Sequence, residues 1–113
     1  MKKIFATTLV AALSSSALAE YSTGELGRII TMASGTVLFG MKVQPPNSCN
    51  NFTEQVRFDA TTQAGKNLLS SLLAAKAANR TVNIWYTAST TPGTSYPTCN
   101  EYTMAELTSI AIP

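Results

Sequence analysis

The alternation of apolar and polar residues predicts a β-hairpin early in the chain. Residues 28–33 are rich in β-branched residues. In residues 36–43 every second residue is apolar, which places Val37, Phe39, Met41 and Val43 on one face of a strand. Ser34-Gly35 between them is a short turn, which favours a hairpin. Gly40 interrupts the opposite face and indicates a bulge or a sharp coil of that strand. Residues 20–27 are polar with two glycines, and we expect a leader rather than a core element.

A third strand and a helix follow a loop with two prolines at residues 44–48. Residues 55–59 alternate again and predict the third strand. Residues 63–78 consist mainly of good helix formers, with one apolar stripe at helical spacing. The stripe is formed by Leu68, Leu69, Leu72 and Leu73. Oxygen-bearing side chains that could cap the first turn belong to Asp59, Thr61 and Thr62. Asn79 is a candidate left-handed stop.

The last part of the chain predicts two more strands around a turn-rich loop. In residues 81–88, Val82, Ile84 and Tyr86 share one face, whereas Asn83 and Trp85 share the other. Residues 89–97 are rich in turn-forming residues, and residues 107–112 are apolar again. The order β-β-β-α-β-β predicts an α+β fold. It suits a small five-stranded antiparallel Greek-key barrel of the oligonucleotide/oligosaccharide-binding kind, with one helix between strands 3 and 4. The alternative is a helix lying on an open four- or five-stranded sheet.

Residues 1–19 have the pattern of a secretory signal peptide, which leaves residues 20–113 as a single domain. Lys2 and Lys3 precede an apolar run, and Ala17-Leu18-Ala19 forms a small-residue cleavage box. The apolar run is too short to span a bilayer. We therefore expect a bacterial exported protein, periplasmic or secreted.

Removing the signal peptide changes the charge balance. The whole chain carries a net charge of +2, but two of its eight basic residues lie in the signal, so residues 20–113 hold six basic and six acidic residues. A neutral chain lacks the clustered Lys and Arg that nucleic acids and anionic membrane surfaces require. We therefore expect neither a nucleic acid nor an anionic membrane surface as partner. We also expect no membrane span, because no segment after the signal reaches eighteen apolar residues.

The two cysteines, Cys49 and Cys99, are expected to form a disulfide. An exported chain meets an oxidising compartment, and only one intramolecular pairing exists. Two free thiols or an intermolecular bond are the alternatives. A metal site is not expected, because two thiolates without histidine leave the coordination shell unfilled.

The composition argues against an enzyme and against a cofactor. The chain has no histidine, which removes the most common catalytic base and metal ligand. The nearest candidates for a Ser–Lys dyad lie on the predicted helix: Ser70 or Ser71 with Lys66 or Lys76. Serines and lysines are also what the solvent-exposed face of a helix normally carries, and we favour that explanation. Carboxylate pairs for glycoside hydrolysis would have to come from Glu54, Asp59, Glu101 and Glu106, which no motif connects. Gly65-Lys66-Asn67 lacks the upstream glycine of a phosphate loop.

The sequence contains more residues suited to ligand binding than residues suited to catalysis. Trp85 and Asn83 lie on the strand face opposite the predicted core, Tyr96 lies in the loop before Cys99, and Tyr102 follows it. Aromatic rings stack on the C–H faces of sugars, while Asn, Thr and Ser bind the hydroxyl groups. We take Trp85, Tyr96, Tyr102 and Asn83 as candidate ligand-binding residues. The alternative is that Trp85 packs under the loop at residues 89–97 or on a neighbouring subunit, and that the tyrosines are structural.

The order and pattern of elements resemble the B subunits of AB5 toxins, in the pertussis-like and subtilase-cytotoxin-like group. The points of similarity are Glu20 followed by an aromatic residue, Thr23-Gly24, a first strand at residues 27–31, a helix at residues 68–78 and the strand at residues 82–86 directly after it. The chain is also similar to small exported bacterial proteins of unknown role, through residues 58–62 and 64–66.

The resemblance implies an oligosaccharide-binding barrel, a ring of five subunits with helices lining the pore, a glycan site and an enzymatic A subunit as partner. The chain departs from the group at two points. Leu26 stands where the group has a serine that holds sialic acid, and the two cysteines lie differently. The sialic-acid site of the group is therefore not carried over to any residue of this chain. The order of elements, the neutral charge, the lack of histidine and the aromatic residues near polar loops lead us to expect a non-catalytic, exported glycan-binding module of toxin B-subunit type. The alternative is a stand-alone periplasmic structural or protein-interaction domain without a sugar site.

Overall fold

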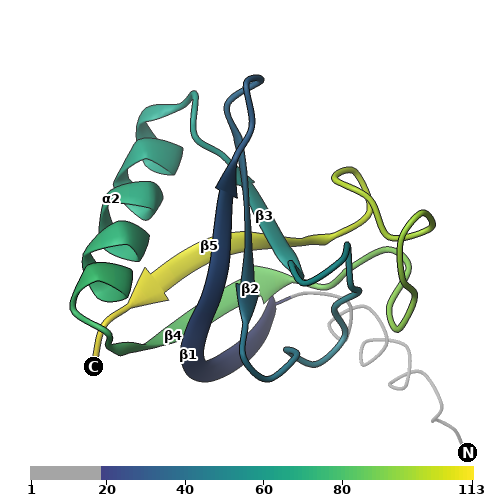
Figure 1. The fold of residues 1–113 in the computed structure, drawn as a ribbon, viewed down its shortest axis with the longest axis horizontal. Helices are drawn as coiled ribbons and strands as arrows, with labels where there is room; N and C mark the ends of the chain where they lie inside the picture. Colours follow the sequence, from purple (N-terminus) through teal and green to yellow (C-terminus); the bar gives the residue numbers. More distant parts are fainter. Residues whose placement is uncertain (1–18) are drawn as a thin grey trace, which may run out of the picture.

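The computed structural model describes residues 19–113, so the predicted signal peptide lies outside the described residues except for Ala19. Five strands and one helix make up the fold (Figure 1). They are β1 (Ala19–Thr31), β2 (Thr36–Met41), β3 (Val56–Asp59), α2 (Gln63–Ala77), β4 (Thr81–Thr87) and β5 (Ala105–Ala111). This confirms the predicted α+β class, the order of elements and the helix between strands 3 and 4.

The five strands form one mixed sheet that closes on itself in the order β1-β2-β3-β5-β4. The prediction that all strands are antiparallel is wrong, because β3 and β5 run parallel, with Val56 opposite Ala105 and Arg57 opposite Glu106. The other four pairings are antiparallel. The reason is geometrical: five strands in a closed order cannot alternate in direction all the way round, so one neighbouring pair has to be parallel.

Strand β1 makes this closure and includes the segment expected to be a leader. Its first half pairs with β4 from Ala19 to Glu25, and its second half pairs with β2 from Leu26 to Thr31. The expectation of a leader at residues 20–27 is therefore wrong. These residues read as polar because the outer face of β1 is solvated, so exposed and half-buried positions alternate along it.

Gly40 serves a close approach and not a bulge of its own strand. The irregularity in the β1–β2 pairing lies on β1, between Leu26 and Ile29. Gly40 is buried, and a Cβ atom there would lie 2.2 Å from the carbonyl oxygen of Thr53. The absence of a side chain lets the turn at residues 51–54 lie directly on β2.

The core fills the inside of the closed sheet and extends to α2. Every described strand contributes inward-facing side chains, and α2 adds Leu72 and Ala75. Two details of the predicted pattern are wrong: Leu73 is 49% exposed and Val43 is 77% exposed. Leu73 lies at the solvent edge of the leucine stripe, and Val43 lies beyond the end of β2.

Helix α2 begins and ends where side-chain chemistry predicts. Thr62 is the N-cap, and its hydroxyl accepts a hydrogen bond from the backbone N–H of Gly65 at 3.0 Å. Asp59 instead accepts two bonds from Thr61, which lower the pKa of its carboxyl. Asn79 takes a left-handed conformation (φ 56°), which confirms the predicted stop.

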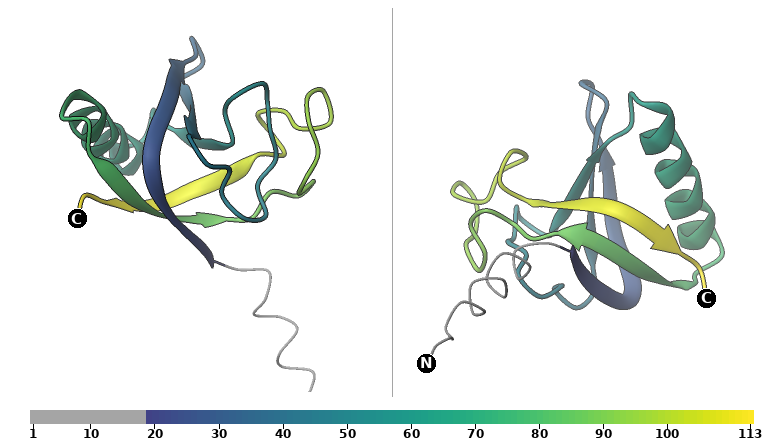
Figure 2. Two further views of the ribbon diagram at one scale, coloured as in Figure 1. Left: turned by 60° about the horizontal axis from the view of Figure 1, so that its bottom comes forward. Right: turned by 180° about the vertical axis from the view of Figure 1, so that it is seen from behind.

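The helix and the long loop between β4 and β5 lie at opposite ends of the sheet. Figure 2 shows α2 at one end and the loop of residues 88–104 at the other in the view from behind, in agreement with Figure 1. The loop end is therefore free of the helix and available for a site.

Tyr86 combines a fully buried ring with a hydrogen-bonded hydroxyl group. Its ring is fully buried and its hydroxyl donates to the carbonyl oxygen of Pro46 at 2.6 Å. Burial, with a smaller effect of Glu20, raises the pKa of Tyr86 from 10.0 to about 12. Because the folded pKa is raised, its contribution to stability is complete below the ordinary pKa and is lost as the pH rises from there through about 12.

We expect Tyr86→Phe to lower the free energy of unfolding by about 1 kcal/mol at neutral pH, through loss of this hydrogen bond. The difference between wild type and variant should narrow as the pH rises past 10. Urea denaturation of both proteins at neutral and alkaline pH measures it, and a difference independent of pH would contradict the burial argument.

Candidate functional site

Two long loops at the free end of the sheet are joined covalently and by backbone hydrogen bonds. Cys49 and Cys99 form a disulfide, as predicted, and within residues 19–113 no free cysteine remains. Near the disulfide, the N–H of Asn50 donates to the carbonyl oxygen of Thr94 at 3.0 Å. The N–H of Tyr96 donates to the carbonyl oxygen of Asn50 at 2.9 Å. The loop before β3 and the loop before β5 therefore form one rigid unit.

A second, smaller apolar cluster lies on the outer face of the sheet beneath these loops. Because side chains alternate along a strand, Leu38 points away from the core that Val37 and Phe39 fill. Leu38 packs with the disulfide and Met104, and Ile30 and Met32 of the first hairpin pack against this cluster.

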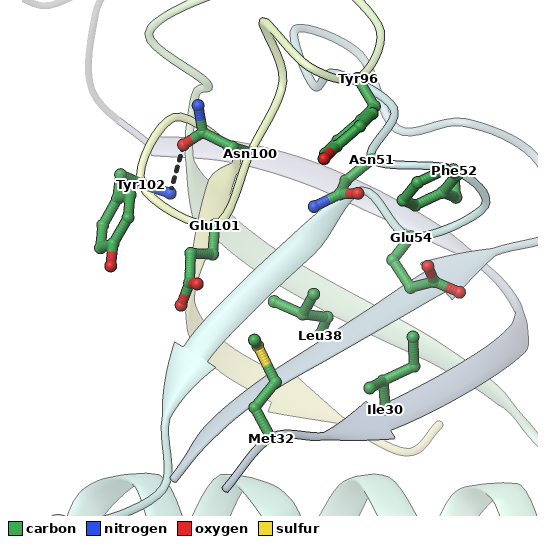
Figure 3. A pocket seen from close by; sticks show the side chains of 10 residues that line it. All are labelled: Ile30, Met32, Leu38, Asn51, Phe52, Glu54, Tyr96, Asn100, Glu101 and Tyr102. Atoms are coloured by element: carbon green, nitrogen blue, oxygen red, sulfur yellow. Dashed lines mark hydrogen bonds between the residues drawn. The ribbon is translucent and has the colours of Figure 1, made fainter. Parts of the chain in front are cut away.

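This outer cluster is the floor of a cavity of about 330 Å³, which we call the loop pocket. Figure 3 shows Ile30, Met32 and Leu38 at its base, with Phe52 and Tyr96 on one side and Glu101 and Tyr102 on the other. The lining is completed by Asn51, Glu54 and Asn100. The volume is at the lower end of the range for small-molecule sites, where an apolar surface with a few polar groups is usual.

Exposed aromatic rings form the rim of the loop pocket. Phe52 and Tyr96 are stacked, with ring centroids 4.6 Å apart and planes at 26°. They are 67% and 55% exposed, and Tyr102 is 78% exposed. Phe52 has a left-handed backbone (φ 61°), which is unfavourable for a bulky residue. The turn thus holds an apolar ring in water instead of burying it.

Polar groups are distributed among the rings. The side-chain oxygen of Asn100 accepts a bond from the N–H of Tyr102 at 2.8 Å, which orders the segment that carries Tyr102 (Figure 3). Asn51 is buried, and the only hydrogen bond of its side-chain amide recorded among the described residues is a long one to the sulfur of Met104, at 3.8 Å. Its remaining capacity is available to a ligand.

Glu54 is buried at the edge of the pocket and forms an ion pair with Arg28. The Nε atom of Arg28 lies 2.7 Å from one carboxylate oxygen, and the hydroxyl of Thr53 donates at 2.6 Å. Burial alone would raise the pKa of Glu54, but the bonds from Arg28 and Thr53 and the charge of Arg28 outweigh it and hold the pKa below its usual 4.5. This pair therefore stabilises the fold above the ordinary pKa and is lost as the pH falls through the lowered one.

We expect Arg28→Met to lower the free energy of unfolding at neutral pH, and by more than the control below, because it leaves the Glu54 carboxylate without its cation. The variant should also lose the acid-side decline of stability that the pair causes below about pH 4.5 in the wild type. Denaturant unfolding from neutral to acidic pH measures both effects. Lys42→Met is the control, since Lys42 pairs with Glu25 where both side chains are exposed. If the free energy of unfolding fell by the same amount at acidic pH in the wild type and in Arg28→Met, the Arg28–Glu54 pair would not be the cause of the decline.

The structure separates the four predicted binding residues into two groups. Tyr96 and Tyr102 line the loop pocket, but Trp85 and Asn83 do not. Trp85 is 36% exposed and lies against Tyr21 of β1, with ring centroids 5.2 Å apart. Asn83 accepts a hydrogen bond from the hydroxyl of Thr23.

Sequence reasoning missed Phe52, Asn51, Asn100 and Glu101 as pocket residues. The predicted disulfide was the available signal, because it brings the residues after Cys49 next to those around Cys99. Leu26, which stands at the sialic-acid serine of the resembling toxins, is buried in the core and only 4% exposed.

Comparisons with protein-family models, curated proteins and solved structures find no match to this chain.

The candidate metal-binding and carboxylate residues can be placed in the part of the chain that the structure describes. No cluster of three or more His, Cys, Asp or Glu residues placed to hold a metal occurs there. Of the four candidate carboxylates, Glu54 is engaged by Arg28, and Asp59 by Thr61. Within residues 19–113, no helix has both the length and the apolar character to cross a membrane.

Proposed function

We propose that the chain is an exported, non-catalytic binding module whose ligand is a glycan held in the loop pocket. The observation that carries this proposal is the apolar floor with a rim of three exposed rings, Phe52, Tyr96 and Tyr102, interleaved with side-chain amides. Rings stack on the C–H faces of a sugar, and the buried amide of Asn51, which has one long hydrogen bond among the described residues, binds its hydroxyl groups.

The proposal includes a barrel of the oligonucleotide/oligosaccharide-binding kind. Its support is the closed strand order with β3 parallel to β5, together with a helix between β3 and β4. Barrels of this kind bind ligands on the face of strands 2 and 3 and with the loops that follow strands 1 and 4. The loop pocket uses Met32 after β1, Leu38 on β2 and the loop after β4. The neutral charge of residues 20–113 favours a sugar over a nucleic acid as the ligand.

A toxin-type ring of five subunits with an enzymatic partner remains part of the proposal through the resemblance. The solvent side of α2 carries an apolar side chain and small residues, which would let helices of neighbouring subunits approach closely: Leu73 is 49% exposed, and Ala74 and Ala77 are small and exposed. Native mass spectrometry of residues 20–113 tests it, and a strict monomer would remove the ring.

The second candidate is a stand-alone periplasmic protein-interaction domain. The observation that favours it is the exposed Tyr21–Trp85 pair on the outer face of β1 and β4, away from the loop pocket. Aromatic residues on an open sheet face are typical of protein interfaces. Under this candidate the loop pocket would bind no sugar.

We expect the mature chain, residues 20–113, to bind a glycan on an array, and Tyr96→Ala to weaken that binding about tenfold, because it removes one stacking ring from the rim. Titration calorimetry with the array ligand measures the affinities of both proteins. Tyr21→Ala is the matched control, an exposed tyrosine outside the pocket, and it should bind like the wild type. An empty array, or equal loss in both variants, would overturn the proposal.

A further inference from the structure

The loop pocket has a charge that distinguishes between classes of glycan. Its ten lining residues include two carboxylates, Glu54 and Glu101, and no lysine or arginine. Glu54 is compensated by Arg28, whose guanidinium makes bonds of 2.7 and 3.3 Å to it. Glu101 is half-buried and has no ion pair among the residues that the structure describes. The pocket therefore carries one uncompensated negative charge.

Glu101 lies where this charge acts on a ligand. In Figure 3 its carboxylate extends towards the floor near Met32, between the floor and Tyr102. Next to the apolar floor formed by Ile30, Met32 and Leu38, a charge interacts more strongly with a ligand than it would in bulk water. Aromatic faces also attract cations through the ring quadrupole, and rings with a carboxylate are the arrangement that recognises ammonium groups.

We propose that the ligand of the loop pocket is an amino sugar with a free, protonated amine, and that Glu101 is its counter-ion. This inference rests on the proposed function, because it assumes that the pocket binds a glycan. It predicts that an anionic sugar such as sialic acid is repelled.

The observations favour an amino sugar over the lysine side chain of a protein. A lysine is a flexible four-carbon chain with one polar end, so it would use the carboxylate and leave the Asn51 amide without a ligand partner. A sugar ring with an amine uses the rings, the Asn51 amide and the carboxylate at once.

The test compares short oligomers of glucosamine with N-acetylglucosamine oligomers of the same length, which differ at the nitrogen of every residue: an ammonium group in the first and a neutral acetamide in the second. Calorimetry on residues 20–113 is done at about pH 6, where an amine of this kind is protonated. We expect at least threefold tighter binding of the glucosamine oligomers, with a difference that shrinks as salt is added. Glu101→Gln should weaken glucosamine binding three- to tenfold and leave N-acetylglucosamine binding unchanged. Glu106→Gln, which removes an exposed carboxylate outside the pocket, is the control.

Each other outcome contradicts a defined part of the inference. Equal binding of the two oligomers, or tighter binding of sialylated glycans, overturns the amino-sugar assignment while the proposed function stands. Binding of a lysine oligomer as tight as that of the glucosamine oligomer overturns the sugar in favour of a basic peptide. Binding of none of these probes, together with an empty array, overturns both proposals.

Discussion

Replacing both cysteines, Cys49→Ala with Cys99→Ala, should lower the free energy of unfolding by about 4 kcal/mol. The disulfide closes a loop with a sequence separation of 50 residues, and in the chain-entropy model this restricts the unfolded chain by roughly that amount. Both cysteines are fully buried, so the double variant also loses packing against Leu38 and Met104. A domain of this size has a total stability of about 5–15 kcal/mol, so the loss brings the fold close to its limit.

Guanidinium unfolding followed by the fluorescence of Trp85 measures the loss. Reduction of the wild type is the matched comparison, since it breaks the same bond without a substitution. We also expect the double variant to lose glycan binding before it loses the sheet, because the disulfide joins the loops that carry Phe52 and Tyr96. A loss below about 1 kcal/mol would show that the loops are held together by other contacts.

Gly65→Ala should destabilise the protein by about 3 kcal/mol, although alanine is the better helix former by about 1 kcal/mol. A Cβ atom at Gly65 would lie 1.7 Å from the carbonyl oxygen of Asp59 and 2.9 Å from the Cα of Ala60. These are backbone atoms at the end of β3, so the first turn of α2 would have to move away from the sheet. Loss of the Thr62 cap would follow, because its hydroxyl accepts from the N–H of Gly65.

The control for Gly65→Ala is Ser70→Ala, on an exposed position of the same helix. It should change the free energy of unfolding by less than about 0.5 kcal/mol. Denaturant unfolding with far-ultraviolet circular dichroism compares the two. Equal stability of wild type and Gly65→Ala would mean that α2 does not lie as close to Asp59 as described.

Local periodicity predicted the elements well because each is encoded within a few neighbouring residues. Alternation at Val82, Ile84 and Tyr86 indicated β4 and its inner face, and all three side chains are fully buried. Leu72 on the predicted helix is buried as well. The expectation of a leader at residues 20–27 is wrong because the outward residues of this half of β1 face water and make the segment polar.

Relations between distant segments were harder to predict. The parallel β3–β5 pair depends on how five strands close, and nothing within either strand encodes it. The loop pocket combines residues that are far apart in the sequence, from Ile30 to Tyr102. Tyr96 and Tyr102 were selected for their chemistry and their nearness to Cys99, whereas Phe52 looked like an ordinary loop residue. Its role follows only from the stacking on Tyr96.

The central claim is that the loop pocket is the binding site of this protein. The most direct test is a ¹⁵N–¹H correlation spectrum of residues 20–113, titrated with glucosamine and N-acetylglucosamine oligomers and with the glycan found on the array. Our account predicts that amide shifts concentrate on residues 51–54 and 96–102, with the Tyr21–Trp85 face unchanged. Shifts confined to Tyr21, Trp85 and their neighbours, or a folded spectrum that no glycan perturbs, would contradict it.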